Sequence, residues 1–413
     1  MSAESSHPKN ALSQQLRDAR RRTRVLTGDL EGPQLFGPKL AVVNPVLWEL
    51  GHVAWFQERW CLRLRADESL SESVLDGADA LYDSAKVAHD TRWDLPLPDL
   101  SGTLDYQDRV LERVLARLER EPDNEWFLYF VQLTLFHEDM HAEAFHYTRQ
   151  TLGYADPLAR AAPPGDAGKG ALDGDVELPG GEFLLGAARN SGFHFDNEKW
   201  AHPVKLEPFR IARAPVTNSQ FLEFVRDGGY RRRELWSPEG WNWKDQAQGP
   251  RYWVERDGEW RERRFAEEVP LDADLPVMHV NWHEANAFCC YSGRRLPSEA
   301  QWEMAASLSR GAPANLGGSG RVHVGEFARG DGVAGCRQML GNVWEWTSST
   351  FAPYPGFVCD PYREYSEPWF GAQRVLRGGS FATPARLISN TWRNFYTPDR
   401  GDIFAGFRTC RIE

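Results

Sequence analysis

The chain of 413 residues contains no apolar run long enough to cross a bilayer, so no membrane-spanning helix is expected. It also lacks an excess of positive charge, because 48 Lys and Arg stand against 59 Asp and Glu and the formal net charge is -11. Nucleic-acid binding needs a basic surface and is therefore not expected. The first ten residues are polar and lack the apolar core of a signal peptide. These absences predict a cytoplasmic protein with neither membrane nor nucleic acid as a partner.

Cysteine is scarce as well. The 6 cysteines form neither a CxxC pair nor a regular pattern, so a disulfide framework is not expected. Buried free thiols in a reducing compartment are the simpler interpretation. The residues are Cys61, Cys289, Cys290, Cys336, Cys359 and Cys410.

One basic cluster stands out against this acidic background, within the first expected helix. Such a cluster is typical of a solvated helix face, and we interpret it so. Its members are Arg17, Arg20, Arg21, Arg22 and Arg24.

The length of the chain predicts two domains. Residues 1–154 are expected to form a helical domain, 155–175 a linker rich in Ala, Pro, Gly and Asp, and 176–413 a second domain. Helices of the first domain would form a bundle, whose core can house a site. They are expected over residues 10–30, 44–65, 104–120 and 125–152.

Start signals mark the second of these helices, because Asn44 can cap its free amides and Pro45 fits the first turn. The second domain is loop-rich instead, with many Gly, Pro and Trp residues. One helical segment, continuing over residues 283–307, is expected there, with short strands at 183–185 and 374–376.

The strongest functional signal is a histidine pair, His137 and His141, on the fourth expected helix. Side chains four residues apart stand one turn above each other, with Cβ atoms roughly 6 Å apart. Two imidazoles on a buried stripe are costly without a partner, and a metal ion provides one. The inward stripe is indicated by Phe130, Leu133, Thr134, Ala144, Phe145 and Thr148.

His52 lies on the second expected helix, with Trp48, Trp55 and Phe56 at helical spacing, so it also points inward. A single histidine in such a place is more often a hydrogen-bonded core residue. The pair on the fourth helix favours a shared metal site instead. Three imidazoles leave positions open for substrate and O2, and they suit iron, copper, nickel or zinc.

The segment from His137 to His141 also spells H-E-x-x-H, the zinc peptidase motif in which Glu138 would be the general base. The continuation disfavours this interpretation. Tyr147 occupies the place of the third histidine of one peptidase class, and Ala144 the place of its glycine. A glutamate ligand some twenty residues on would fall in the linker.

The run NPVLWELGHVAWF over residues 44–56, followed by the histidine-pair helix, resembles the DinB-like domain of the ergothioneine synthase superfamily. The second domain resembles the formylglycine-generating-enzyme, or sulfatase-modifying-factor, fold, which is C-type-lectin-like. Its motifs are PVTN (215–218), RLPSEAQWE (295–303), GNVWEW (341–346), RGGS (377–380) and GFR (406–408). The resemblance implies an α plus mixed α/β protein, a four-helix bundle followed by a loop-rich domain, with the site in the cleft between them.

Formylglycine-generating enzymes bind copper through a cysteine pair shortly after RGGS, and residues 381–393 contain no cysteine. The three histidines match instead the Fe(II) ligands of ergothioneine synthases, which use O2 to join a thiol to C2 of the hercynine imidazole. The resemblance implies Tyr362 as a proton donor, with Tyr365 as the fallback. It also implies that Asn394 holds hercynine, whose trimethylammonium group suits an aromatic wall.

The sequence differs from the ergothioneine synthases at two places that bear on the second substrate. Synthases that use γ-glutamylcysteine carry Asn-Trp-Asp where this chain has Asn394-Phe395-Tyr396, and they tend to carry Gln at Met140. Loss of the carboxylate points to a different donor. Phe395 and Tyr396 offer a flatter, less charged wall, which is more typical of a sugar platform.

Within the superfamily, residues 89–98 and 137–145 resemble the selenoneine synthases, which join hercynine to a 1-seleno-sugar. Arg92 is expected to face this donor, with a surface or interdomain salt bridge as the alternative. The predicted reaction is therefore O2-dependent carbon–selenium bond formation on hercynine. An ergothioneine synthase using γ-glutamylcysteine or cysteine, a zinc hydrolase, and a carbohydrate-binding second domain remain as alternatives.

Overall fold

The computed structural model describes residues 8–158, 171–245, 247–308, 314–318, 320–327 and 335–412. The chain divides into two compact units, Met1–Leu158 and Ala159–Glu413. The division falls inside the segment predicted as a linker, of which residues 159–170 lie outside the described residues. The predicted fold class, a helical bundle followed by a mixed α/β unit, is confirmed.

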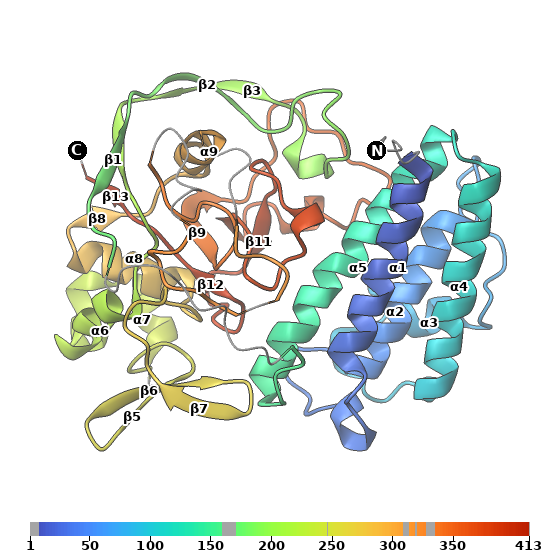
Figure 1. Ribbon diagram of the computed structural model, residues 1–413, viewed down its shortest axis with the longest axis horizontal. Helices are drawn as coiled ribbons and strands as arrows, with labels where there is room; N and C mark the ends of the chain where they lie inside the picture. The colour runs from blue at the N-terminus through green and yellow to red at the C-terminus, as the bar shows by residue number, and fades with distance from the viewer. Residues whose placement is uncertain are drawn as a thin grey trace, which may run out of the picture. The chain divides into compact units, whose positions relative to one another are not determined.

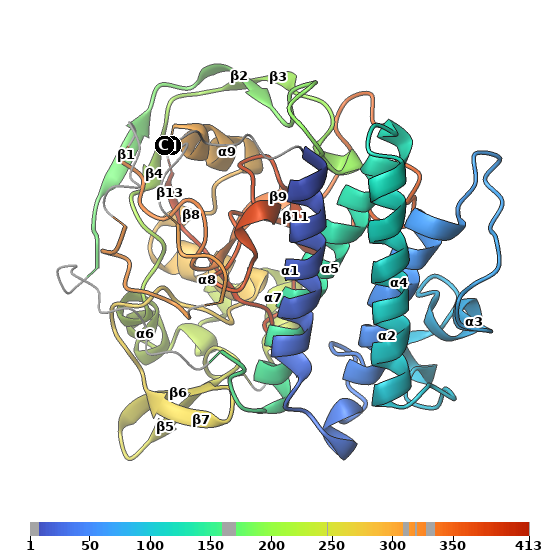
Figure 2. The ribbon, with the colours of Figure 1, turned by 45° about the vertical axis from the view of Figure 1, so that its right-hand side comes forward.

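Long helices build the first unit, and Figures 1 and 2 show them running side by side. α1 packs on α5 and α2 on α4, with further contacts between α2 and α5. The bounds are α1 Pro8–Thr27, α2 Val46–Glu58, α4 Leu100–Arg120 and α5 Glu125–Leu152, with the short α3 at Ala78–Tyr82. The connections hold the 3-10 turns η1, Gly32–Leu35, and η3, His89–Thr91. The predicted bundle is confirmed.

Side-chain caps fix the starts of α4 and α5. Asp99 and Asn124 each accept the backbone N–H three residues on, at 2.7 and 3.1 Å. α5 ends at Gly153, whose φ of 69° costs glycine no strain. α5 therefore has the predicted bounds. α4 begins at Leu100 rather than at residue 104, because Asp99 supplies the cap.

The start of α2 corrects the sequence interpretation of Asn44. The N-cap residue is Pro45, which makes no side-chain cap bond. Asn44 Oδ1 instead accepts a hydrogen bond from Arg92 Nη1 at 2.7 Å, and Asn44 Nδ2 donates to Glu49 Oε2 at 3.5 Å. The Asn44 side chain does not cap the helix because it is engaged by these two partners.

The end of α2 also differs from the prediction of a regular helix to residue 65. The α-helix stops at Glu58, and a π-turn, η2, follows over Arg59–Arg63. The carbonyl of Cys61 in this turn accepts a hydrogen bond from Arg117 Nη1 at 2.7 Å. The wider turn is therefore tied to α4 beside it.

The arginine cluster of α1 is only in part the solvated face that charge patterning predicted, because Arg17 and Arg21 are exposed but Arg20 is not. Arg20 is buried, and its Nε donates to Glu138 Oε1 at 2.8 Å. Its Nη1 donates to the Gln107 carbonyl at 2.6 Å, while Arg24 Nη2 donates to Asp108 at 2.8 Å. The interpretation is wrong for Arg20 because its partners come from helices far along the chain.

In the described part of the second unit, two four-stranded sheets have the orders β1-β4-β13-β8 and β11-β10-β9-β12. β2 pairs with β3, and β6 lies between β5 and β7. All pairs are antiparallel except β12 with β9. The predicted strands at 183–185 and 374–376 lie within β2 and β10 and are confirmed. The bounds are β1 Asp175–Leu178, β2 Gly181–Leu185, β3 His202–Leu206, β4 Phe209–Ala212, β5 Trp253–Arg256, β6 Glu259–Arg264, β7 Glu267–Pro270, β8 Arg294–Arg295, β9 Trp344–Thr350, β10 Arg374–Arg377, β11 Asn394–Tyr396, β12 Ala405–Gly406 and β13 Cys410–Arg411.

The helices of this unit correct the prediction of one continuous segment over 283–307. β8 separates α8 from α9. Two further helices, α6 and α7, were not predicted because they are too short for a 3.6-residue period to show. The α-helices are α6 Asn218–Arg226, α7 Pro238–Lys244, α8 Trp282–Tyr291 and α9 Glu299–Ser307, and the 3-10 turns are η4 Asp196–Glu198, η5 Gly229–Arg231, η6 Arg233–Leu235, η8 Glu367–Trp369 and η9 Ala385–Leu387.

Buried ion pairs join the motifs that carried the resemblance of the second unit. Arg408, of the GFR motif, donates to both oxygens of Glu345, of the GNVWEW motif, at 2.6 and 2.7 Å. Trp302 Nε1 also donates to Glu345, at 2.7 Å. Arg377, of the RGGS motif, pairs with Glu303. All of these side chains are buried, so these motifs hold the core of the unit together.

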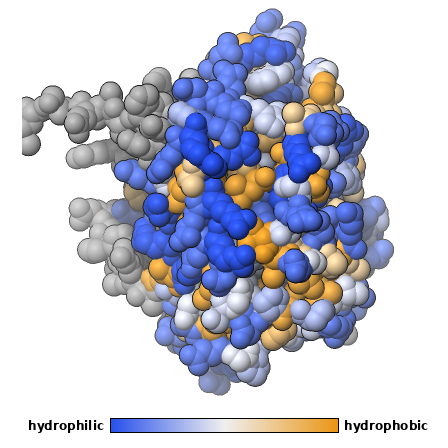
Figure 3. Space-filling view, turned by 90° about the vertical axis from the view of Figure 1, so that its right-hand side faces the viewer, coloured by the Kyte–Doolittle hydropathy of each residue, from blue (hydrophilic) through white to orange (hydrophobic). Residues whose placement is uncertain are grey.

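The hydropathy of the helices and surface, and the state of the cysteines, can be compared with the sequence predictions. Over the described ranges, no helix combines the length and the hydropathy that a membrane span requires. The face in Figure 3 is mostly hydrophilic, with apolar residues in small groups. All six cysteines are free, as predicted, but Cys290 is exposed and Cys359 partly exposed, so the prediction of burial is wrong for these two.

Candidate metal centre

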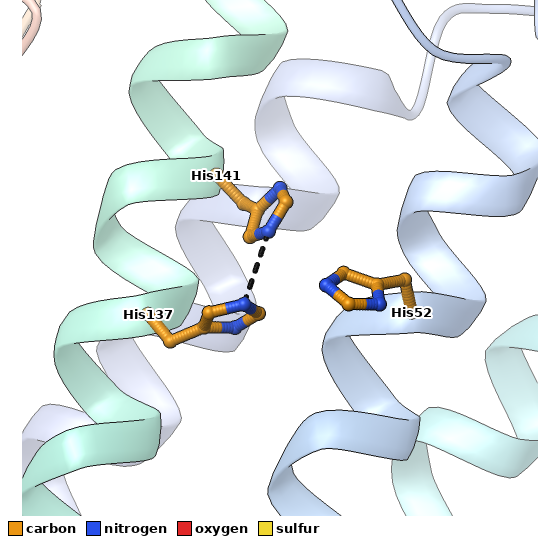
Figure 4. Close-up of side chains that lie close together, drawn as sticks. All are labelled: His52, His137 and His141. Atoms are coloured by element: carbon orange, nitrogen blue, oxygen red, sulfur yellow. Dashed lines mark hydrogen bonds between the residues drawn. The ribbon is translucent and has the colours of Figure 1, made fainter. Parts of the chain in front are cut away.

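Three imidazoles from two helices of the first unit converge on one point. His52 projects from α2 toward His137 and His141 on α5, and the three rings face one another (Figure 4). One ring nitrogen of each lies within 4.8 Å of the other two. Ring centroids are 5.1 Å apart for His52 and His137, 5.2 Å for His52 and His141, and 4.5 Å for His137 and His141. The structure therefore brings together the histidines that the helical spacing singled out.

Packing around the rings explains their orientation. His52 stacks on Trp48, one helical turn earlier, with centroids 4.9 Å apart and planes within 9°. His137 stacks on Phe56, at 3.7 Å and 10°. His52 and His137 are only 3% and 5% exposed, whereas the His141 side chain is 17% exposed. The accessible side of the cluster is therefore the side of His141.

Hydrogen bonds fix the tautomers of two of the rings. His52 Nδ1 donates to the carbonyl of Tyr82 at 2.8 Å, and His141 Nδ1 donates to Glu49 Oε1 at 2.6 Å. A carbonyl or carboxylate oxygen can only accept here, so each Nδ1 carries the proton. The Nε2 lone pairs of both rings are left for a ligand at the centre.

His137 differs from the other two, because its buried Nδ1 has no hydrogen-bond partner among the described residues. Its Nε2 lies 3.2 Å from Nε2 of His141 (dashed in Figure 4). Two nitrogens bound to one ion at about 2.1 Å, with angles of 90–109°, are separated by about 3.0–3.4 Å. The spacing already matches a shared ion, and the donor set fits iron or another first-row metal.

Burial keeps these imidazoles in the form that binds metals. Desolvation lowers the pKa of His52 and of His137 well below the usual range, and the neighbouring His141 lowers both further. Both rings are therefore neutral at physiological pH. Neutral imidazole is the ligand form, since a proton on the donor nitrogen would compete with the ion.

Glu138 does not face this centre, although it is the central residue of the H-E-x-x-H motif. It is 1% exposed, and its carboxylate accepts from Arg20 at 2.8 Å and from Thr23 Oγ1 at 2.9 Å, both on α1. A general base of a zinc hydrolase must lie beside the metal-bound water. The position of Glu138 counts against the hydrolase interpretation.

Arg92, expected to face a sugar donor, lies over the ring of Trp48. Its Cζ is 4.0 Å from the centroid of the Trp48 ring, and Nη2 donates to the Val87 carbonyl at 3.3 Å. Its Nη1 donates to Asn44, and its buried Nε has no hydrogen-bond partner among the described residues. Trp48 thus contacts both Arg92 and His52.

The other expected site residues belong to the second unit. Tyr362 lies 6.0 Å from Tyr365 between ring centroids. Tyr365 stacks on Phe195 at 4.4 Å, and its hydroxyl accepts from Trp392 Nε1 at 3.5 Å. Desolvation raises the pKa of Tyr365 well above the usual range, so its hydroxyl stays protonated.

Asn394, Phe395 and Tyr396 form β11 and are partly buried. Successive side chains of a strand point to opposite faces, so Asn394 and Tyr396 share one face and Phe395 takes the other. Phe395 stacks on Phe351 at 4.0 Å, and the Arg400 guanidinium lies 4.8 Å from the Tyr396 ring. Asn394 Oδ1 accepts the backbone N–H of Phe395 at 2.9 Å.

The sequence reasoning missed Glu49 and Tyr82, the two groups that hold His141 and His52. One signal was present in the buried helix, because Gly51 precedes His52 and an interior glycine indicates a close approach. A Cβ at Gly51 would overlap the ring of Tyr82. Tyr82 itself follows an irregular connection, so no periodicity could place it there.

Comparisons with known proteins cover both units. A family model described as "DinB superfamily" matches residues 15–145. A model described as "Sulfatase-modifying factor enzyme 1-like domain" matches residues 161–321 and 322–412.

Curated relatives extend the match to nearly the whole chain. A "Hercynine oxygenase" of Mycolicibacterium smegmatis is 35% identical over 427 residues, which cover 97% of this chain and 98% of that protein. The "Hercynine oxygenase" of Mycobacterium tuberculosis is 35% identical, covering 94% and 96%. A "Formylglycine-generating enzyme" of Streptomyces coelicolor is 32% identical but covers 60% of this chain and 93% of its own length.

Proposed function

The chain belongs to the family of the hercynine oxygenases, and on that premise we propose that it is an O2-dependent non-haem iron enzyme acting on hercynine. The observation that carries the proposal is the convergence of His52, His137 and His141 in the bundle core. Membership alone does not fix the chemistry, because one fold can host several activities. The histidine cluster supplies a site of the required kind.

Fe(II) would be held by Nε2 of His52, His137 and His141, since the Nδ1 atoms of two of these rings are already engaged. Bound iron supplies the electron transfer to O2 that carbon–chalcogen bond formation requires. The protein's own part is to hold the rings in fixed tautomers and to keep water from two of them. The aromatic side chains of Trp48 and Phe56 do the latter.

We further propose that the second substrate is a 1-seleno-sugar in its selenol form. Joining C2–H of hercynine and Se–H of the donor into a C–Se bond releases two protons and two electrons, and O2 accepts the electrons. Support comes from the chain's own residues, because Phe395 and Tyr396 stand where thiol-using relatives are expected to carry Trp and Asp. Arg92 is proposed as a further contact to the sugar.

For the second unit, we propose Tyr362 as the proton donor and Asn394 as a hercynine contact, both on the family resemblance. Asn394 and Tyr396 share a face of β11, so one substrate could touch both. The trimethylammonium group of hercynine suits an aromatic ring, and Tyr396 offers one on the same face as Asn394.

A donor competition tests the proposal. The purified chain is loaded anaerobically with Fe(II), mixed with hercynine and equal amounts of 1-seleno-glucose, γ-glutamylcysteine and cysteine, and then exposed to O2. We expect the selenium adduct to dominate in the product masses. His52→Ala should abolish all products, and Tyr362→Phe should slow product formation while leaving bound iron unchanged.

The other outcomes are equally decisive. Dominant sulfur adducts would overturn the selenosugar assignment but keep hercynine as substrate. No hercynine adduct with any donor, despite one bound iron per chain, would overturn the proposed activity.

A further inference from the structure

We propose that Glu49 is the positioning residue of the metal centre. Its carboxylate holds His141 with Nε2 turned toward the centre of the cluster. Its negative charge would also balance part of the positive charge of a buried divalent cation. Asn44 in turn holds Glu49, and Arg92 holds Asn44. The inference rests on the proposed metal centre but not on the identity of the chalcogen donor.

The geometry of the Glu49–His141 contact supports this role. Glu49 is on the first turn of α2 and is 1% exposed, and its Oε1 accepts from His141 Nδ1 at 2.6 Å. A hydrogen bond this short, to a charged acceptor, is strong and directional. A carboxylate behind a ligating imidazole fixes the tautomer and raises the basicity of the donor nitrogen.

The second oxygen of Glu49 is held as well. Asn44 Nδ2 donates to Oε2 at 3.5 Å, and Arg92 Nη1 donates to Asn44 Oδ1 at 2.7 Å. The amide of Asn44 is therefore oriented by Arg92, with its NH2 group toward the carboxylate. This chain of contacts explains why Asn44 precedes α2 without capping it.

The three candidate ligands have different supports. His52 is held by a neutral backbone carbonyl, that of Tyr82, whereas His137 stacks on Phe56 and its Nδ1 has no hydrogen-bond partner among the described residues. Among the described residues, Glu49 is the one carboxylate that contacts a ring of the cluster. An effect of charge on ion binding should therefore be concentrated at Glu49.

Charge balance points the same way. A buried carboxylate is costly unless a cation or several donors compensate it. Three neutral imidazoles around a divalent ion would bury two positive charges, and Glu49 offsets one of them through His141. Glu58, at the other end of α2, is compensated differently, because Tyr106, Ser73 and a backbone N–H all donate to it.

The experiment measures binding of the metal alone. Apo protein is titrated anaerobically with Co²⁺, which reports ligand geometry through its visible absorption, and the dissociation constant is measured for wild type, Glu49→Gln and Glu49→Ala. Glu58→Gln is the matched control, a buried glutamate of the same helix that does not face the cluster. Thermal unfolding of each apo protein shows whether the bundle is intact.

We expect Glu49→Ala to bind Co²⁺ about 10–100-fold more weakly, as is usual when a carboxylate behind a ligating histidine is removed. Glu49→Gln keeps a hydrogen-bond acceptor but loses the charge, so it should fall between Glu49→Ala and wild type. It should also shift the Co²⁺ absorption. Glu49→Gln matches the native side chain in size, so it keeps the test open if the alanine variant fails to fold.

Unchanged Co²⁺ affinity and absorption in a folded Glu49→Gln protein would overturn the inference. An equal loss in Glu58→Gln would do the same, because it would show a general effect on the bundle. His52→Ala and His141→Ala in the same titration keep this failure apart from a failure of the proposed function. If these variants bind Co²⁺ like wild type, or if wild type binds none, the metal centre itself is wrong.

Discussion

The two units bury polar side chains in contrasting ways. In the second unit, several buried charges are paired with an opposite charge, as in the pairs Arg408–Glu345, Arg377–Glu303 and Arg393–Glu299. In the first unit, three histidines turn their free nitrogens toward a shared point. We call a buried ion pair closed, because its two side chains satisfy each other and leave no atom for a ligand. We call the histidine cluster open, because ring nitrogens remain available to bind a ligand, and such a cluster is the better indicator of a functional site.

The same contrast exists between two adjacent residues of α5. Glu138 forms a closed pair with Arg20, whereas His137 has a buried nitrogen without a hydrogen-bond partner among the described residues. Sequence alone placed both in one motif. The structure shows that only the histidine belongs to the candidate site, because successive helical residues point in different directions.

Breaking a closed pair should give the largest effect on stability. Glu345→Gln leaves the guanidinium of Arg408 without its counter-charge at a site that is 0% exposed. We expect the free energy of unfolding to fall by about 3–5 kcal/mol, as measured by urea denaturation. The Co²⁺ affinity of the folded protein should stay at the wild-type value. A marked loss of metal binding would contradict the division between closed and open polar groups.

Glu284 allows a sharper test, because it is buried with only neutral donors. Tyr230 and the backbone N–H of Asn281 donate to it, and burial raises its pKa from 4.5 to about 7. Between these values the folded state keeps a proton that the unfolded state has lost. Stability should therefore decrease as pH rises through this window, by roughly 3 kcal/mol in total.

Glu284→Gln should remove that part of the pH dependence and stabilise the protein above pH 7. Urea denaturation at pH 5 and pH 8, for wild type and variant, measures the difference. Parallel pH profiles for the two proteins would show that Glu284 is ionised in the folded state across this range.

The smallest expected effect concerns Arg92, where positioning and donor binding can be told apart. Arg92→Met should weaken Co²⁺ binding by less than tenfold, because Arg92 reaches the cluster only indirectly, through Asn44 and Glu49 and through the Trp48 ring. Titration of the apo protein and the KM for each donor are measured together. A raised donor KM with unchanged Co²⁺ affinity would show that Arg92 binds the donor. It would also show that the Arg92–Asn44 hydrogen bond does not contribute to metal binding.

Much of the first unit could be predicted from the sequence. α5 has the predicted bounds because its apolar stripe is long and because Gly153 ends it. The spacing of His137 and His141 then placed two rings on one face. Helical periodicity thus accounts for the three inward histidines.

The supports of these rings could not be predicted in the same way. Tyr82 ends the five-residue helix α3 and Arg92 follows the 3-10 turn η3, and both elements are too short for a periodic pattern to show. An asparagine just before a helix favours the prediction of an N-cap, and Asn44 has this position. Its side chain is instead engaged by Arg92, which is distant in the sequence. In the second unit, strands of two to seven residues are too short for alternation to show.

Tyr82 packs so closely against Gly51 that the orientation of His52 depends on Gly51 having only a hydrogen atom in place of a side chain. Replacing that hydrogen with a methyl group would push the tyrosine away from α2, and its carbonyl would no longer meet the imidazole of His52. Neither residue has a side chain directed at the centre of the histidine cluster. Alanine at position 51 should nevertheless have the same effect as loss of a candidate metal ligand. The size of the side chain, and not its functional group, therefore limits which residues position 51 can accept.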